Sequence, residues 1–209
     1  MTAVKILKVW SINRILILSL LISFICLGSF SSTAVAANNP QAVIQNGTTR
    51  LISLLKQYPL ESPSLRVKVR TILDNYFDFR AIAKNTLGPE WRRQPPAKRE
   101  QFTKYFTRLL FKDYLGKVKK YAAQSIAYAL VEQGPTSALV RAYVSGAQNL
   151  APISVDFYLH PTNGNWKVYD IVTEGVGLAT SYRAQFSSIL ANSSFDALLR
   201  HLKAKDAKG

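Results

Sequence analysis

Side chains that commonly perform catalysis or bind metal ions are scarce in this sequence. It contains two His and one Cys among 209 residues, which is too few for most zinc sites or for most Cys- or His-based catalysis. His160 and Asp156 could belong to a serine–histidine–acid triad, but residues four apart on a strand are separated by about 13 Å, and no nucleophile elbow accompanies them. We predict that His160 and His201 are edge or surface residues, and that the protein has no catalytic residue, no cofactor and no metal site.

Two other patterns that resemble catalytic or phosphate-binding motifs have simpler explanations. Asp170 and Glu174 could act as a carboxylate pair, but pairing at a strand end or capping of a turn is the commoner role for such residues. The sequence Gly175-Val176-Gly177 is too short for a phosphate-binding loop and follows no Rossmann pattern. An enzyme is therefore the least favoured class of function.

Positive charge is the more informative feature. The chain has 27 Lys and Arg against 12 Asp and Glu, a net charge of +15, which favours an anionic partner such as a nucleic acid, a membrane surface or a lipid headgroup. Ten of the basic residues lie between Arg92 and Lys120, where only two acidic residues oppose them. Within this segment Lys104, Arg108 and Lys112 recur every four residues, a spacing that slightly destabilises an isolated helix. We predict that this stripe docks on anionic membrane surfaces or acidic partners; the alternative is a solvated face that keeps the protein soluble.

Helices come first along the chain and strands later. Apolar residues at three- and four-residue spacing predict helices over 41–58, 63–76, 79–86 and 95–115. Ser62 and Pro63 suit the N-cap and first position of the second helix, and Asp78 suits the N-cap of the third.

From about Ser125, apolar residues recur at every second position instead of every third or fourth. Four strands are predicted, over 125–131, 137–146, 152–160 and 165–172. Asn163-Gly164 between the last two is a tight-hairpin signal. Two helices, 178–191 and 194–204, are predicted to follow. The order predicts an α+β fold, with helices packed on one face of a roughly four-stranded antiparallel sheet.

The N-terminal segment has the three parts of a secretory signal. Three basic residues precede an uncharged run, Ile15–Phe30, and Ala34-Val35-Ala36 follows as a signal-peptidase site. We predict a signal peptide over 1–36 and a single domain over 37–209; the alternative is an N-terminal membrane anchor. Removal of the signal lowers the net charge from +15 to +12 and leaves no Cys, so no disulfide can stabilise the domain. Export also argues against a nucleic-acid-binding module, and the basic segment has no RNP-type motif.

Three stretches of the chain resemble the MlaC family, also called toluene-tolerance (Ttg2) auxiliary proteins. They are YFDFRAIAKNTLGPEW (76–91), REQFTKYFTRLLFKDY (99–114) and WKVYDIVTEGVGLATSYRAQF (166–186). The similarity spans nearly all of the mature chain, in the same order and at similar spacing. Gly177 is a departure, because many relatives carry Ser there.

The resemblance implies a periplasmic phospholipid-binding carrier of an ABC-type lipid transport system. It implies acyl chains buried in an apolar cavity between sheet and helices, with the headgroup outside. The implied partners are a phospholipid, an inner-membrane ABC lipid transporter complex and an outer-membrane lipoprotein complex, and the implied state is a monomer. Two alternatives remain: a hopanoid-type lipid carrier of the same family, and a basic anion- or nucleic-acid-binding module.

With this resemblance, thirteen apolar and aromatic residues become candidates for lining the cavity. They are Tyr76, Phe79, Leu87, Trp91, Phe106, Leu110 and Tyr114 from the helices, Val144, Val155, Phe157 and Val168 from the sheet, and Tyr182 and Phe186 from the helix that closes it. The alternative for each residue is an ordinary place in the core, because periodicity does not distinguish a filled core from a hollow one.

Overall fold

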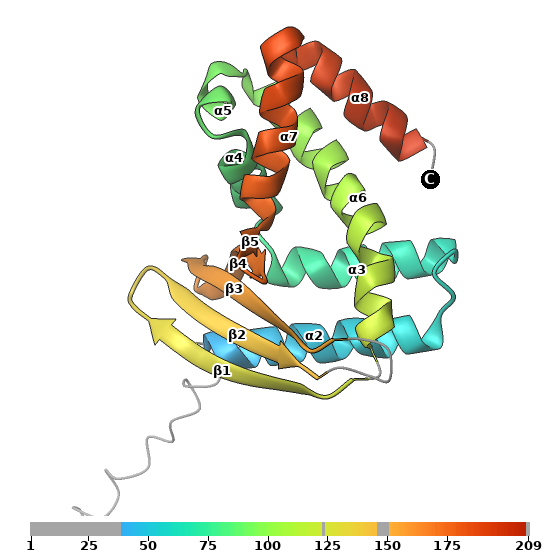
Figure 1. Ribbon diagram of the computed structural model, residues 1–209, viewed down its shortest axis with the longest axis vertical. Coiled ribbons are helices and arrows are strands. Elements are labelled where there is room, and N and C mark those ends of the chain that lie inside the picture. Colours follow the sequence, from blue (N-terminus) through green and yellow to red (C-terminus); the bar gives the residue numbers. More distant parts are fainter. Residues whose placement is uncertain (1–38, 123, 146–150, 208–209) are drawn as a thin grey trace, which may run out of the picture. The chain divides into compact units, whose positions relative to one another are not determined.

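The predicted α+β class is confirmed. The computed structural model describes residues 39–122, 124–145 and 151–207, in which helices precede and follow an antiparallel sheet (Figure 1). The predicted signal peptide, 1–36, lies outside the described residues, as does Gly146, the last residue predicted for the second strand. No helix within the described ranges combines the length and apolar character that a membrane crossing requires.

Five helices come before the sheet and two after it in the described part of the chain. They are α2 (Pro40–Gln57), α3 (Pro63–Tyr76), α4 (Phe79–Leu87), α5 (Pro89–Arg93), α6 (Pro96–Tyr121), α7 (Leu178–Asn192) and α8 (Phe195–Ala207). The single turn of α5 was not predicted. Helix α6 continues past Leu115, where it was predicted to end, because Leu115 and Val118 both pack against α2 and α3. These tertiary contacts stabilise the helix across Gly116, where intrinsic propensity is poor.

Local sequence signals explain where α3, α4 and α5 begin. Pro63 occupies the first turn of α3 as predicted, although the Ser62 side chain makes no capping bond. Asp78 caps α4, since its Oδ1 accepts a hydrogen bond from the Ala81 amide at 2.8 Å. Gly88 joins α4 to α5 with a φ of 56°, a left-handed conformation that favours glycine.

The sheet has one more strand than predicted. Its order is β1 (Ile126–Gln133), β2 (Ala138–Val144), β3 (Ile153–Thr162), β4 (Asn165–Thr173) and β5 (Val176–Gly177), with each strand antiparallel to the next. The hairpin turn between β3 and β4 is confirmed, because Asn163 and Gly164 both have positive φ, at 51° and 78°. The extra strand is the two-residue β5, which lies just before α7.

One face of the sheet, called the inner face here, packs against α2. Its apolar residues include Tyr128 of β1, Ala138, Val140, Ala142 and Val144 of β2, Ile153, Val155, Phe157 and Leu159 of β3, and Trp166, Val168 and Ile171 of β4. Tyr158 pairs with Asp170 and Leu159 with Val168, so β4 has one extra residue, Tyr169, at a β-bulge. The bulge places Ile171 on the same face as Val168, which strict alternation would forbid.

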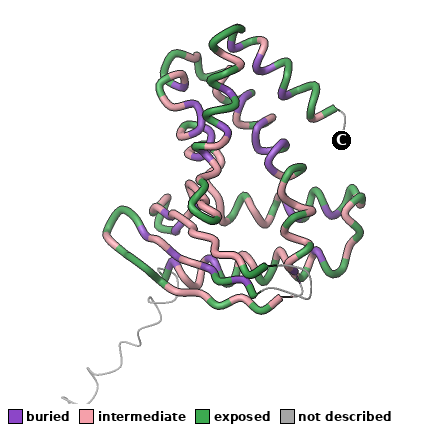
Figure 2. Tube along the Cα trace, viewed as in Figure 1, coloured by how far each residue is buried: buried purple, intermediate pink, exposed green. Residues whose placement is uncertain are grey.

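The core consists of three apolar clusters. The helix cluster is formed by residues of α4, α5, α6, α7 and α8, and it contains Phe102, Phe106 and Phe186. Figure 2 shows buried residues along α6 and α7. The sheet cluster joins Ile44 of α2 to the inner face. A third cluster joins α2 and α3 around Leu55 and the C-terminal part of α6.

Two valines of α3 give a matched test of this packing. Val69 is 1% exposed and Val67 is 68% exposed. Val69→Ala should lower the free energy of unfolding by about 2 kcal/mol, because it removes two buried methyl groups and leaves a cavity. Val67→Ala should change it by less than about 0.5 kcal/mol. Urea denaturation measures both, and equal losses would contradict the assigned orientation of α3.

Candidate functional site

Eight of the predicted cavity residues belong to or border the helix cluster. Leu87, Trp91, Phe106, Leu110, Tyr182 and Phe186 are buried in it, and Phe79 and Tyr114 pack against it half-buried. The ring centroid of Phe106 lies 5.0 Å from that of Tyr182 and 5.5 Å from that of Phe186. These rings therefore contact one another directly, as in a filled core.

The predicted sheet residues lie together on the inner face. Val168 and Val144 are buried, whereas Val155 and Phe157 are half-buried. Ile171 lies beside Phe157 and is also half-buried. We call Val155, Phe157 and Ile171 the apolar strip. Sequence reasoning missed Ile171, since no local signal marks the bulge that turns it inward.

A row of three aromatic rings leads from the sheet cluster to α6. Phe77 stacks on Phe79 at a centroid distance of 5.6 Å, and Phe79 meets Phe111 edge-on at 5.6 Å. The guanidinium of Arg70 lies 5.9 and 5.7 Å from the Phe79 and Phe111 rings, and it forms an ion pair with Asp74 at 2.8 Å. Phe77 and Phe111 were not singled out from the sequence, although both lie in the stretches that carry the family resemblance.

Two partly buried polar contacts hold α7 against β4 and α6. Asp170 Oδ1 accepts hydrogen bonds from the Ile171 amide at 2.9 Å and from the Ala179 amide at 3.2 Å, at the start of α7. Burial nevertheless raises the pKa of Asp170, because desolvation outweighs these bonds. The Tyr182 hydroxyl donates to Asp113 Oδ2 at 2.7 Å, and burial together with this carboxylate raises the pKa of Tyr182 far above its ordinary value.

The carboxylates of Asp170 and Glu174 have structural partners. Glu174 Oε1 accepts a hydrogen bond from the Ser154 amide at 2.7 Å, while Asp170 caps α7. The two therefore fit the strand-end and capping roles predicted for them.

His160 is half-buried and does not pair with Asp156. Its Nε2 lies 3.1 Å from Asp78 Oδ2 and 3.3 Å from Thr162 Oγ1, and Asp156 pairs with Arg141 at 2.5 Å. A catalytic triad uses opposite ring nitrogens for the nucleophile and the carboxylate, whereas both partners of His160 contact the same nitrogen. His201 is exposed on α8, as predicted.

The predicted docking stripe is exposed on α6, and α8 already contacts two of its three members. Arg108 pairs with Asp206 at 2.5 Å, and Lys112 Nζ donates to the Lys205 carbonyl oxygen at 3.3 Å. Lys104 Nζ lies 5.8 Å from the centre of the Tyr105 ring. The stripe is thus accessible, with part of its charge neutralised by α8.

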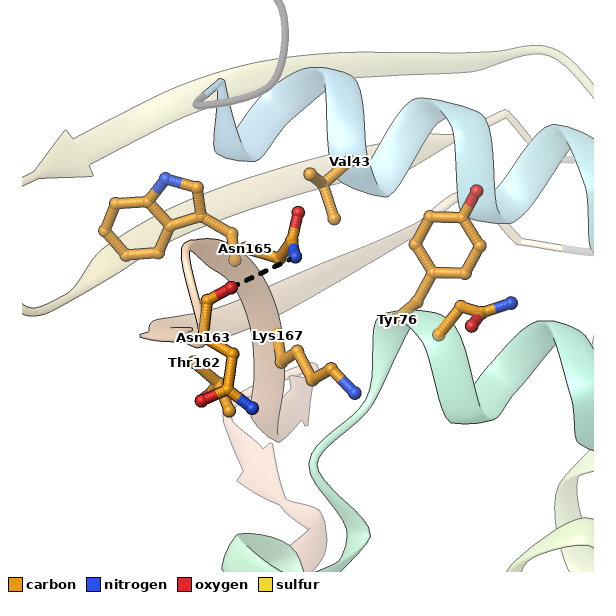
Figure 3. Close-up of a pocket in the computed structure, with 8 residues that line it drawn as sticks. Val43, Tyr76, Thr162, Asn163, Asn165 and Lys167 are labelled. Carbon is orange, nitrogen blue, oxygen red and sulfur yellow. Dashed lines mark hydrogen bonds between the residues drawn. The ribbon is translucent and has the colours of Figure 1, made fainter.

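Two surface pockets have mainly polar or charged lining residues. One, of about 310 Å³, lies between α2, α3 and the β3–β4 hairpin (Figure 3). Its lining residues are Val43, Asn75, Tyr76, Thr162, Asn163, Asn165, Trp166 and Lys167, so it contains one predicted site residue, Tyr76. The other, of about 480 Å³, lies on α6. Neither pocket is lined by the apolar strip, and the apolar cavity stays a prediction.

Comparison with known proteins gives a consistent result. The family model described as MlaC protein matches residues 45–204. The toluene tolerance protein ttg2D of Pseudomonas putida is 27% identical over 179 residues, covering 82% of each chain. The intermembrane phospholipid transport system binding protein MlaC of Haemophilus influenzae is 28% identical over 182 residues, covering 82% of this chain and 84% of that one.

A solved structure shares the fold. It is the phospholipid-binding protein of Ralstonia solanacearum in complex with a phospholipid, with a TM-score of 0.71 and 23% identity. The match covers 81% of this chain and 98% of that chain.

The raised pKa of Asp170 predicts a specific pH dependence. Below its ordinary pKa of 3.8, the Asp170 acid is protonated in both folded and unfolded chains. As pH rises through the higher folded-state pKa, ionisation of the buried group costs the wild type stability. The side chain of the Asp170→Asn variant can still accept the hydrogen bond from the Ala179 amide of α7, and it does not ionise. The free energy of unfolding of the variant minus that of the wild type should therefore rise over this pH range.

Denaturation of both proteins at a series of pH values measures this difference. Subtracting the wild-type curve cancels the titration of all other groups. A difference that stays flat or falls with rising pH would contradict the assigned direction.

Proposed function

Because the chain belongs to the MlaC family, we propose that it is a periplasmic phospholipid-binding protein that carries lipid between membranes as part of an ABC-type transport system. The observation that supports this most is the apolar strip: Val155, Phe157 and Ile171 lie on the inner face and keep part of their surface exposed. A lipid tail gains about 0.8 kcal/mol for each methylene buried on such a surface. The relatives named for phospholipid transport and binding support the same ligand class.

The acyl chains would lie between the sheet and the helices. In the described residues, Phe77 is the apolar side chain that packs against both the helix cluster and the sheet cluster. Helices α4 and α7 meet the sheet along β4. We infer that α4 and α7 move apart from β1–β3 together with the filled helix cluster, while α2 keeps its contacts with the sheet. This motion would open a route for lipid over the apolar strip.

The thirteen predicted residues would then have three kinds of role. Val155, Phe157, Phe79 and Tyr114 are half-buried and would contact lipid directly, together with Ile171 and Phe77. The buried members would form the rigid wall behind them. Tyr76, in the pocket of Figure 3, would lie at the edge of the site.

Export and the partners follow from the same proposal. The segment 1–36 would direct the chain to the periplasm, where it would act as a monomer. Its partners would be an inner-membrane ABC lipid transporter complex and an outer-membrane lipoprotein complex. The role is that of a carrier, without an enzymatic step.

Adjacent residues of β3 give a test of lipid binding. Purified wild type should yield roughly stoichiometric phospholipid on solvent extraction and mass spectrometry, which also separates phospholipid from hopanoid. Phe157→Asn should lower the lipid per protein several-fold, because it puts an amide on the apolar strip. Tyr158→Asn, on the opposite face, should retain lipid. Thermal denaturation of all three proteins distinguishes a loss of lipid binding from a loss of folding. Wild-type protein that yields no lipid would refute the proposal.

The docking stripe predicts a salt-dependent transfer rate. Replacing Lys104, Arg108 and Lys112 by Glu should slow lipid delivery to vesicles containing anionic lipid by about tenfold at low ionic strength. The defect should shrink at high ionic strength, because salt screens exposed charges. Asp206→Asn is the matched control: it breaks the Arg108 ion pair but leaves the stripe positive, so delivery should not slow. Equal defects at both ionic strengths would rule out electrostatic steering.

A further inference from the structure

The C-terminal third of α6 forms one side of a second pocket, whose positive charge is only partly compensated. The pocket is a shallow surface hollow with a volume of about 480 Å³. Its lining residues are Leu60, Lys112, Asp113, Gly116, Lys117, Lys119 and Lys120. The residues of this pocket thus include four lysines and one aspartate.

None of these four lysines forms an ion pair with a carboxylate among the described residues. Three have neutral partners: Lys112 donates to the Lys205 carbonyl at 3.3 Å, Lys119 donates to the Tyr58 carbonyl at 3.4 Å, and Lys117 Nζ lies 4.6 Å from the Tyr114 ring centre. The carboxylate of Asp113 accepts the Tyr182 hydroxyl. Earlier on the same helix, Lys98 and Arg108 do have carboxylate partners, both on α8.

Stabilisation of α6 explains only part of this charge. Lys119 and Lys120 lie in the last turn, where the helix dipole presents about half a negative charge and favours cations. The effect falls off within that turn, so it does not extend to Lys112 or Lys117. The pocket retains roughly three positive charges against that half charge, and an anion would relieve their mutual repulsion.

We propose that this pocket binds a phosphate group, with the ammonium groups of Lys112, Lys117 and Lys120 donating hydrogen bonds to its oxygens. Lysine suits this role as a point charge. Leu60 and the Tyr114 ring under Lys117 provide apolar surface beside the phosphate, so the site also suits the start of a lipid's glycerol and acyl region. As the site of a phospholipid headgroup it rests on the proposed function; free phosphate is the other source of the same chemistry.

Gly116 lines the pocket, and the NMR signal of its amide reports on binding without any lipid. In delipidated protein at constant ionic strength, its ¹H–¹⁵N NMR signal should shift saturably with inorganic phosphate and with glycerol 3-phosphate, but not with chloride. Lys117→Gln/Lys120→Gln should weaken both affinities by about tenfold or more, since two charged hydrogen bonds are lost. Arg200→Gln/Lys203→Gln on α8 removes the same charge from another exposed surface and should bind as wild type does. No saturable shift, or equal weakening in both double variants, would overturn the proposal.

Reloading the protein with phosphatidylglycerol identifies the source of the phosphate. If phosphate no longer shifts Gly116, the carried lipid's headgroup occupies the site; if phosphate still binds, the site takes free phosphate. Both results support phosphate binding. If the protein carries lipid but shows no phosphate effect, this inference is overturned and the proposed function stands. If it binds phosphate but carries no lipid, the proposed function is overturned and phosphate binding stands.

Discussion

The junction at Phe77 and Asp78 is the contact on which the arrangement of this protein depends. Phe77 packs against both the helix cluster and the sheet cluster, and its backbone forms a bridge with Val168 of β4. The next residue continues the connection: the Asp78 amide donates to the Val168 carbonyl at 2.9 Å, its side chain caps α4, and its second oxygen contacts His160 on β3. Two consecutive residues thus connect α3 and α4 to the centre of the sheet.

A lipid carrier has to combine a stable core with apolar surface that is open to its cargo. Moving two acyl chains of roughly fourteen buried methylenes each into water costs on the order of 20 kcal/mol. Without a Cys after residue 26, the protein has to obtain its stability from side-chain packing. The filled helix cluster around Phe106 provides that packing, and the apolar strip around Phe157 keeps surface available. The separation of these two regions would let one serve stability and the other serve the proposed lipid binding.

Helix α6 connects the apolar and electrostatic properties of the molecule. One side carries Phe102 and Phe106, which are 0% and 1% exposed, and another carries the basic residues. Helix α8 neutralises the charges of Lys98 and Arg108. Towards the C-terminal end of α6, α8 supplies a backbone carbonyl, and the lysines there form no ion pair with a carboxylate in the described part of the chain. The same helix therefore contributes to the core, to the proposed docking stripe and to the lysine-lined pocket.

Features decided by neighbouring residues were predictable from the sequence alone: the cap at Asp78, the Asn163-Gly164 turn, the alternation along β3, and from these the α+β class. Three stretches of sequence that resemble the MlaC family, in the same order and at similar spacing, also identified the family. The tertiary structure alone decided that α6 continues past Gly116, that the bulge at Tyr169 turns Ile171 inward, that Arg108 pairs with Asp206, and that Phe106 is enclosed while Phe157 stays partly open. The physical reason is that periodicity shows which face of an element is apolar, whereas burial and charge pairing depend on what covers that face, and the covering groups come from distant parts of the chain.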